Sequence, residues 1–259
     1  NNSYGIFMIE RTDEDGISLF RMAHKPANVL TAEFSDTLWN DIKETREDPT
    51  VRAVVLSGTG SAFSAGVDLF RVIQDGPDYV DALLSSLSGL LDGLRKFPKP
   101  LVAAVNGHAI AGGAVVACAC DYRVMVRGNG KIGLPELQVG VPFFSVALEI
   151  MRGIVPARYL REVLLLGRSF NPEDARERGL VNEIVDSGNL LPRALEIARR
   201  LATIPEATFA LSKRQLSMPP DTMQDLDEEL QAIWQAEESH AHIRAYLERT
   251  LGKSVSNDV

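Results

Sequence analysis

The chain has 259 residues, 45% of them hydrophobic and 24% charged, which is the composition of an ordinary soluble globular protein. Its formal net charge is −8 and its basic residues are scattered, whereas a nucleic-acid-binding surface should carry a basic patch. No apolar run reaches the roughly 18 residues that span a membrane. We therefore expect neither a nucleic-acid partner nor a membrane partner.

The two cysteines and the chain ends bear on the compartment. Cys118 and Cys120 lie one residue apart, so they cannot easily form a disulfide, and no further Cys or His cluster supplies metal-ligand spacing. We interpret both as small buried side chains in a reducing compartment, and we predict no metal site. Residues 1–10 lack a signal-peptide pattern, and the last four, SNDV, are not a peroxisomal signal. The expected location is the cytoplasm, or the mitochondrial matrix if a transit segment has been removed.

The first half of the chain alternates short apolar runs with helical patterns. We expect a hairpin of two strands around the turn at 13–16, an extended loop at 25–30, and an irregular segment at 74–77. Strands interleaved with helices imply an α/β core with parallel pairings. The expected strands lie at residues 4–10, 17–20, 51–57, 101–105, 122–126 and 131–134. The expected helices lie at residues 31–46, with Thr31 as the N-cap, 79–97 and 114–120.

The last third of the chain is predicted to be mostly helical. We expect a core at residues 1–200, followed at 201–259 by a helical region that forms a lid, a trimer-forming extension or both. No low-complexity linker separates the two parts. The expected helices lie at residues 144–153, 156–166, 172–178, 190–202, 206–217 and 221–251.

A strand, turn and helix follow one another after residue 51 and again after residue 101, which indicates a repeated ββα unit. Each repeat contains a glycine turn, AGVD at 65–68 and AGGA at 111–114. If the two strands are neighbours, both turns leave the same edge of the sheet. Two backbone N–H groups would then converge on one oxygen atom, which is the geometry of an oxyanion hole. The alternative is a pair of ordinary glycine turns before core helices.

Among the acids, Glu136 stands between apolar neighbours in the sequence GLPEL. A carboxyl group in such surroundings should have a raised pKa, as a general acid or base requires. The alternative is an exposed glutamate after a proline turn. His108 lies in the glycine-rich turn, and the other histidines are expected to be solvated. The sequence supports no Ser/His/Asp or Cys/His arrangement.

Several motifs together resemble the enoyl-CoA hydratase/isomerase (crotonase) superfamily. They are FSAGVDL at 63–69, NGHAIAGG at 106–113, CDYR at 120–123, GLPE at 133–136 and NPEDARERGLV at 171–181. The resemblance covers roughly residues 6–216 and is specific for the family rather than for one reaction. It implies an α/β fold in which repeated ββα units form a spiral, with a helical C-terminal region. It also implies a homotrimer or a dimer of trimers.

The resemblance further implies an acyl-CoA thioester substrate and no cofactor, since coenzyme A is part of the substrate. The thioester oxygen would accept hydrogen bonds from the backbone N–H groups of Val67 and Gly112. Lys253 of a neighbouring subunit would also approach the coenzyme A. The other residues implied near the substrate or its coenzyme A are Lys25, Ala27, Ala65, Gly66, Asp68, Leu69, Gly113, Val115 and Phe144.

The chain departs from the family pattern at two positions that decide the chemistry. The family's hydratases use two glutamates, and here the first position is Val115 while the second is Glu136. Dienoyl-CoA isomerases carry a further acid eight residues after the second glutamate, at the position of Phe144. One carboxylate suffices to move a proton from C2 to C4 of a 3-enoyl-CoA, and an apolar wall of Val115 and Phe144 would exclude water.

The sequence therefore predicts a Δ3-cis/trans-Δ2-enoyl-CoA isomerase with Glu136 as its single acid/base. The segment from residue 111 to 136 also looks more like mitochondrial-type Δ3,Δ2-enoyl-CoA isomerases than like hydratases. The alternatives are a weak hydratase, a thioester hydrolase, a decarboxylase, and a non-catalytic acyl-CoA-binding protein.

Overall fold

The computed structural model describes residues 8–217, 227–241, 243 and 245. The strands are β1 (Ile9–Glu14), β2 (Ile17–Met22), β3 (Ala53–Gly58), β4 (Ala62–Ser64), β5 (Leu101–Val105), β6 (His108–Ile110), β7 (Tyr122–Val126), β8 (Ile132–Gly133), β9 (Ser169–Phe170) and β10 (Glu183–Val185). The helices are α1 (Ala32–Glu44), α2 (Leu69–Gln74), α3 (Gly76–Lys96), α4 (Gly112–Ala119), α5 (Glu136–Val139), α6 (Ser145–Ile154), α7 (Ala157–Leu165), α8 (Pro172–Glu177), the 3₁₀ turn η1 (Ser187–Asn189), α9 (Leu190–Ala202), α10 (Glu206–Ser217) and α11 (Asp227–Gln235).

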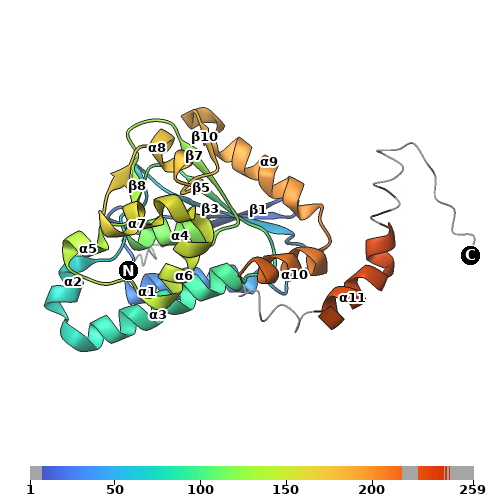
Figure 1. The fold of residues 1–259 in the computed structure, drawn as a ribbon, viewed down its shortest axis with the longest axis horizontal. Coiled ribbons are helices and arrows are strands. Elements are labelled where there is room, and N and C mark those ends of the chain that lie inside the picture. Colours follow the sequence, from blue (N-terminus) through green and yellow to red (C-terminus); the bar gives the residue numbers. More distant parts are fainter. Residues whose placement is uncertain (1–7, 218–226, 242, 244, 246–259) are drawn as a thin grey trace, which may run out of the picture.

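The strands form two sheets built from repeated ββα units (Figure 1). The larger sheet has the order β1-β2-β3-β5-β7-β10, and the smaller has the order β4-β6-β8-β9. Three successive units each give one strand to the larger sheet and the next strand to the smaller: β3 with β4, β5 with β6, and β7 with β8. The corresponding strands of successive units pair in parallel. The predicted α/β class, the parallel pairings and the ββα repeat are confirmed.

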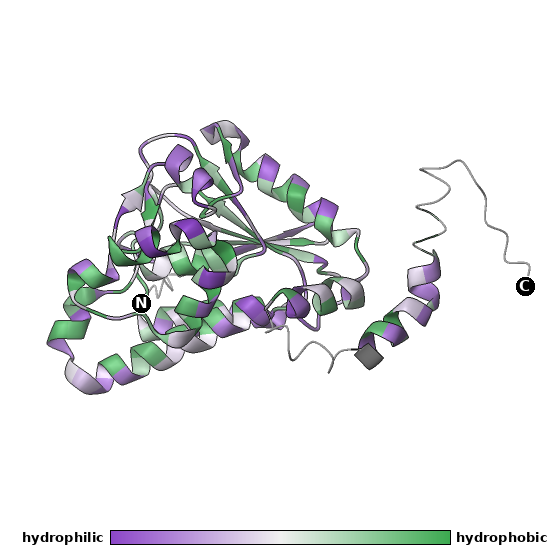
Figure 2. Ribbon diagram, in the orientation of Figure 1, coloured by the Kyte–Doolittle hydropathy of each residue, from purple (hydrophilic) through white to green (hydrophobic). Residues whose placement is uncertain are grey.

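Helices cover both faces of the larger sheet. Successive side chains of a strand point to opposite faces, so apolar side chains on both faces need a covering layer on each side. In β5, Ala103 and Val105 belong to the main core with α1, α3, α4 and α6, whereas Val102 and Ala104 face α9. The inner strand β5 is apolar on both faces for this reason, and green predominates at the centre of the sheet in Figure 2. The small side chains of α4 are all buried inside the main core.

The first strand of the N-terminal hairpin extends further along the chain than predicted. β1 spans residues 9–14, so Asp13 and Glu14 lie in a strand and not in the turn. Residues 4–7 of the strand predicted at 4–10 lie outside the described residues. The turn consists of Asp15 and Gly16, both with positive φ (50° and 77°), which matches the twist of a two-residue hairpin. β1 is an exposed edge strand, where charged side chains are tolerated.

Several short elements were not predicted, because two or three residues carry no recognisable period. They are β4, β6, β9 and β10, and β6 lies within the segment expected to be a glycine turn. The segment 74–77, expected to be irregular, joins two helices, with Pro77 in the first turn of α3. The segment 25–30, expected to be extended, is a turn with a cis Lys25–Pro26 bond and positive φ at Ala27 and Asn28.

The helical last third is confirmed, with one correction. The predicted helix at 221–251 is not continuous, because α11 ends at Gln235 and a bend follows at Ala236. Residues 221–226, 242, 244 and 246–251 of this prediction lie outside the described residues. Among the described residues, no helix is both long and apolar enough to cross a membrane.

A buried ion pair fastens α10 to the core. Lys213 of α10 donates to the carboxylate of Asp121 at 2.9 Å and to the carbonyl of Leu94 at 3.2 Å. Asp121 lies at the start of β7 and also accepts the N–H of Leu101, and burial raises the pKa of its carboxyl group. Helix α11 lies at the periphery of the molecule (Figure 1), where Glu229 of α11 forms an ion pair with Arg214 of α10. The division of the chain at residue 200 stays a prediction.

Candidate active site

Three neighbouring parallel strands of the smaller sheet each lead directly to one of the predicted catalytic positions. β4 ends three residues before Val67, β6 ends two residues before Gly112, and β8 ends three residues before Glu136. β6 pairs with β4 on one side and with β8 on the other. Because the carboxyl ends of parallel strands meet at one edge, the sheet brings the three positions together.

The two glycine turns are in direct contact. Gly66 has a φ of +84°, and a Cβ placed on it would lie 2.6 Å from the carbonyl oxygen of Ile110 and 3.0 Å from Ala111 Cβ. Only glycine fits both this backbone conformation and this distance. A Cβ on Gly112 would lie 3.8 Å from Val67 Cγ2, so the two predicted N–H donors belong to adjacent residues in space.

Both of these N–H groups are left without a protein acceptor among the described residues. Val67 forms a bridge with Leu30, but its hydrogen bonds use the carbonyl of Gly66 and the N–H of Asp68. The N–H of Gly112 lies in the first turn of α4, where no carbonyl precedes it in the helix. The dipole of α4 adds partial positive charge at this end. The arrangement can therefore accept a negatively charged oxygen.

Ala111, the N-cap of α4, adopts an unusual backbone conformation. Its φ of 51° and ψ of −125° are rare for a residue with a side chain and cost about 1–3 kcal/mol. No side chain caps the helix, and the carbonyl of Ala111 accepts the N–H groups of Ala114 and Val115. This strained corner turns the chain from β6 into α4 within one residue. This corner could not be predicted from the sequence, because alanine is not a typical turn residue.

The turn at residues 25–28 lies against the Val67 turn, as predicted. The carbonyl of Ala27 accepts the N–H of Ala65 at 2.9 Å, while Lys25 and Ala27 themselves are exposed. The residue that joins the two turns is Asn28, which the sequence did not single out. Its buried side chain donates to the carbonyls at 62 and 63, and its own carbonyl accepts from Ser64 Oγ at 2.7 Å. Asn tolerates the positive φ found there, and that was the available signal.

Two of the residues predicted to contact substrate also have structural roles. Asp68 caps α2, because its carboxylate accepts the N–H groups of Phe70 and Arg71 at 3.1 and 3.2 Å. Gly113 allows α4 to approach β4, since a Cβ on it would lie 2.4 Å from the carbonyl oxygen of Ser64. Leu69 begins α2 and is exposed. The structure thus accounts for Asp68 and Gly113 without a ligand.

Glu136 is the first residue of α5, and its carboxylate is partly withdrawn from water. Atom Oε2 is buried and has no hydrogen-bond partner among the described residues. This desolvation raises the pKa of Glu136 to about 7, and a hydrogen bond from its own backbone N–H opposes the rise. The exposed glutamate that was the alternative is therefore excluded. A carboxyl group with this pKa can both accept and return a proton at neutral pH.

The two residues predicted to form an apolar wall, Val115 and Phe144, both pack in the core. Val115 lies in the first turn of α4 and is buried, with 1% of its surface exposed. Phe144 is the N-cap residue of α6, packs against the same core and is half-buried. Helix α6 packs against α4, so both residues belong to one layer of the core.

His108 and the two cysteines do not form a second site. His108 is exposed, and its ring accepts the N–H of Lys131 at 3.3 Å. Cys118 and Cys120 are buried and unpaired, and burial raises the pKa of the Cys118 thiol to about 11. Both remain thiols at neutral pH, as predicted for inert side chains. Lys253 lies outside the described residues.

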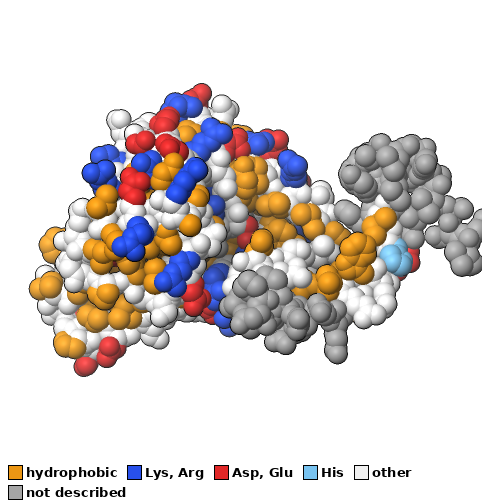
Figure 3. Space-filling view, in the orientation of Figure 1, with side chains coloured by type: hydrophobic (Ala, Val, Ile, Leu, Met, Phe, Trp, Pro, Cys, Tyr) orange, Lys and Arg blue, Asp and Glu red, His pale blue; other side chains and the backbone are white. Residues whose placement is uncertain are grey.

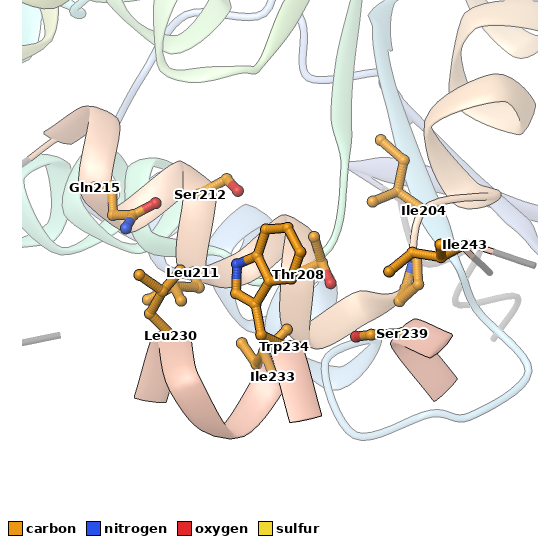
Figure 4. Close-up of a pocket in the computed structure, with 11 residues that line it drawn as sticks. Ile204, Thr208, Leu211, Ser212, Gln215, Leu230, Ile233, Trp234, Ser239 and Ile243 are labelled. Atoms are coloured by element: carbon orange, nitrogen blue, oxygen red, sulfur yellow. The ribbon is translucent and has the colours of Figure 1, made fainter. Parts of the chain in front are cut away.

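A groove of about 380 Å³ opens elsewhere, between α10 and α11 (Figure 4). The ring of Trp234 lies across it, facing Thr208 and Leu211 of α10 (Figure 4). The described residues that line it are mainly apolar, and none of them has an ionisable side chain. General acid/base chemistry therefore has no group there, and the candidate active site is the strand edge described above.

Comparison with known proteins places this geometry in a family. The family model described as "Enoyl-CoA hydratase/isomerase" matches residues 12–253. A Thermus thermophilus protein provisionally named an enoyl-CoA hydratase is 37% identical over 196 residues, covering 74% of this chain and 77% of its own length. Carnitinyl-CoA dehydratase of Escherichia coli K12 is 31% identical over 189 residues, covering 72% of each chain.

Solved structures share the fold over nearly the whole chain. DspI of Pseudomonas aeruginosa superposes with a TM-score of 0.84 at 25% identity, covering 94% of this chain and 95% of that one. EchA3 of Mycobacterium tuberculosis superposes with a TM-score of 0.76 at 27% identity, covering 95% and 100%. EchA3 is described there as an enoyl-CoA hydratase, provisionally, and in another solved structure as an enoyl-CoA isomerase. The names of these proteins therefore do not separate the two reactions.

The contact between the turns predicts a difference between two glycine substitutions. Gly66→Ala and Gly60→Ala both place a side chain at positive φ (84° and 71°), at a cost of roughly 1–2 kcal/mol. Only Gly66→Ala also drives a methyl group against the backbone of Ile110, whereas Gly60 has open space. Urea unfolding should show the larger loss for Gly66→Ala. Equal losses would contradict a close contact between the turns.

The burial of Glu136 predicts that its removal stabilises the fold at high pH. Its pKa is about 7 in the folded chain and near the ordinary 4.5 when unfolded, so the folded state binds more protons in between. Stability should therefore fall as pH rises from 4.5 to 7. At pH 8, Glu136→Gln should raise the free energy of unfolding by on the order of 3 kcal/mol, and at pH 4 hardly at all.

The matched control for this measurement is Glu149→Gln, which removes a mostly exposed carboxylate from α6. Its effect on the free energy of unfolding should be small at both pH values. A Glu136→Gln variant that is no more stable than wild type at pH 8 would show that the carboxylate is solvated in the folded protein.

Proposed function

Since the chain belongs to the enoyl-CoA hydratase/isomerase (crotonase) family of acyl-CoA enzymes, we propose that it is a Δ3,Δ2-enoyl-CoA isomerase. Glu136 is its acid/base, and the N–H groups of Val67 and Gly112 form its oxyanion hole. The observation that carries the proposal is a lone carboxyl group with a pKa of about 7 beside two unpaired N–H donors, with a buried valine where a second acid would stand.

The proposed reaction moves one proton and one double bond. The Glu136 carboxylate removes a proton from C2 of a 3-enoyl-CoA, and the C2 electrons pass to the thioester oxygen to give a dienolate. The N–H groups of Val67 and Gly112 stabilise that oxygen, which carries the developing negative charge. The carboxylic acid then returns the proton at C4, and the product is the 2-enoyl-CoA. Glu136 ends in its starting state.

The raised pKa suits a residue that must act in both directions. A carboxylate with the ordinary value of 4.5 would be a weak base toward a C–H bond and would hold a proton poorly at neutral pH. The same burial is unfavourable for stability, because atom Oε2 has no hydrogen-bond partner among the described residues. Exclusion of water by Val115 and Phe144 would also protect the dienolate from competing reactions.

Hydration is the second candidate, because several relatives carry hydratase or dehydratase names. Adding water across the double bond benefits from a second carboxylate to position the water, and Val115 has no group that could do this. The same oxyanion hole would also serve a thioester hydrolase, a decarboxylase or a non-catalytic acyl-CoA-binding protein. These remain outcomes of the assay.

The proposal needs no cofactor, since coenzyme A arrives with the substrate. We propose that its binding surface is formed by the turns at 25–28 and 65–69, which the Ala27–Ala65 hydrogen bond holds together. Lys25 is exposed on this surface and would face the phosphate groups.

The decisive assay offers 3-enoyl-CoA and 2-enoyl-CoA thioesters separately and identifies the products by mass. Wild type should convert the 3-enoyl form to its isomer of equal mass, and it should add little water to the 2-enoyl form.

The kcat of the wild type should fall as pH drops through about 7, because protonation of Glu136 removes the base. Glu136→Gln should lower kcat by about 10²–10⁴-fold while acyl-CoA binding persists. Glu149→Gln is the matched control.

Three results would overturn this assignment. Strong hydration with negligible isomerisation would make the protein a hydratase despite Val115. Full isomerase activity in Glu136→Gln would identify another base. Binding of acyl-CoA by calorimetry without turnover of any thioester would indicate a binding protein.

We also propose that the chain assembles with copies of itself into a trimer or a dimer of trimers. Large apolar side chains are exposed on three helices, including Ile73 of α2 (83%), Leu216 of α10 (88%) and Trp234 of α11 (64%). In Figure 3, orange side chains gather over the left part of the body and along α11. Such exposed apolar surface is typical of protein interfaces.

Light scattering should give a mass of three or six times the 28.3 kDa of one chain. Trp234→Glu should shift the population toward lower mass, because it places a charge in an apolar contact. Lys96→Glu, at an exposed ion pair on α3, is the control and should leave the mass unchanged. A mass of 28.3 kDa at micromolar concentration would refute the proposal.

A further inference from the structure

Helix α5, which begins with Glu136, has little that holds it in place by itself. It is a single turn of four residues, and isolated helices of this length are not stable. No side chain caps its N-terminus, and it ends at Gly140 in the left-handed region. Leu137 and Val139 are both exposed, at 40% and 49%, so apolar burial does not anchor it. The position of Glu136 must depend on contacts with other elements.

Such a contact comes from Gln138. Its side-chain amide donates to the carbonyl oxygen of Leu166 at 2.9 Å. Leu166 is the C-cap residue of α7, where backbone carbonyls have no partner within the helix. The hydrogen bond therefore joins α5 to the end of a longer helix and satisfies an acceptor that would otherwise need water.

The chain around this hydrogen bond is shaped to receive Gln138. Gly167, directly after Leu166, is buried and has a φ of +57°. A Cβ on Gly167 would lie 2.8 Å from Gln138 Cγ and 3.2 Å from its Cδ. The glutamine side chain thus lies against the bare backbone of Gly167, where any larger residue would displace it.

The same contact closes a loop between two paired strands. β8 leads into α5, and α7 leads through Gly167 into β9, which pairs with β8 at Gly133 and Ser169. The Gln138–Leu166 bond therefore lies just beyond the paired ends of β8 and β9. It can fix the direction in which α5 leaves the smaller sheet, next to Gly112.

We infer that Gln138 is a positioning residue, whose bond to Leu166 clamps α5 against the end of α7 and so holds the Glu136 carboxylate at the oxyanion-hole edge. The inference rests on the proposed role of Glu136 as acid/base. Without the clamp, α5 should fray and Glu136 should reach water. Desolvation is the main cause of its raised pKa, so the pKa should fall toward the ordinary 4.5.

The test compares Gln138→Leu, which keeps the size but removes the donor, with Gln231→Leu on α11 as a matched exposed control. The Glu136 carboxyl is titrated by carbon-13 NMR in the free protein, and its signal is assigned by its loss in Glu136→Gln. Gln138→Leu should lower its pKa by at least about one pH unit, and Gln231→Leu should leave it near 7.

Kinetics supply an independent readout on 3-enoyl-CoA. In Gln138→Leu, kcat at pH 7 should fall by about 10- to 100-fold because the base is misplaced, while KM changes little. The acid limb of the pH–kcat profile should move to lower pH by the same amount as the NMR titration. A merely structural role would lower stability without moving this limb.

Gly167→Ala reaches the same contact from the other side, because its methyl group would push Gln138 away. It should shift the Glu136 titration in the same direction. The double variant should shift it no further than the larger single change, since both remove one interaction.

An unchanged Glu136 titration in both Gln138→Leu and Gly167→Ala would overturn the inference, even if kcat fell. The NMR titration needs no substrate, so it separates this inference from the proposed function. A shifted titration in a protein that isomerises no 3-enoyl-CoA would leave the clamp standing and refute the isomerase assignment.

Discussion

The parallel pairing of β4, β6 and β8 is the constraint on which the candidate site depends. These strands contain only two or three residues each. Each strand nevertheless ends beside its neighbour, and one candidate site residue follows each strand at the same edge of the sheet. The close contact of Gly66 with the carbonyl of Ile110 fixes the two N–H donors relative to each other. Neither donor depends on a side chain, so the proposed oxyanion hole would be a property of the backbone and of three packed turns.

Burial of the Glu136 carboxylate gives the candidate site its chemistry, and other unfavourable features lie at the same site. Oε2 of Glu136 is buried without a partner, Ala111 holds a costly backbone conformation, and α5 is a single turn. Elsewhere the buried charges are paired or hydrogen-bonded: Lys213 meets Asp121, and Lys99 donates to the carbonyls of Thr45 and Asp48. Proteins keep such unsatisfied and strained groups where the surrounding fold over-determines them, and here the two sheets and α4 do so.

The family motifs divide into those that build the fold and those that position the chemistry. In CDYR, Asp121 binds α10 and β5, and buried Arg123 donates to the carbonyl of Cys120, so this motif is structural. The glycine turns and Glu136 form the edge at which substrate would react. This division explains why relatives with one fold carry hydratase, dehydratase and isomerase names. A single side chain, such as Val115 in place of an acid, can change the reaction without touching the motifs that specify the fold.

The sequence by itself determined the α/β class, the ββα repeat and the family, because glycine turns and apolar strands leave strong local signals. Its assignment of Val67, Gly112 and Glu136 to the active site stays a prediction. It ended the first strand too early and missed β4, β6, β9 and β10, since strands this short exist only through their partners. It also gave no indication of Asn28 or Gln138, whose partners lie 28 to 36 residues away in the chain. Only the tertiary structure decided that the two turns touch and that Glu136 is desolvated, because close approach and burial arise from packing between segments distant in sequence.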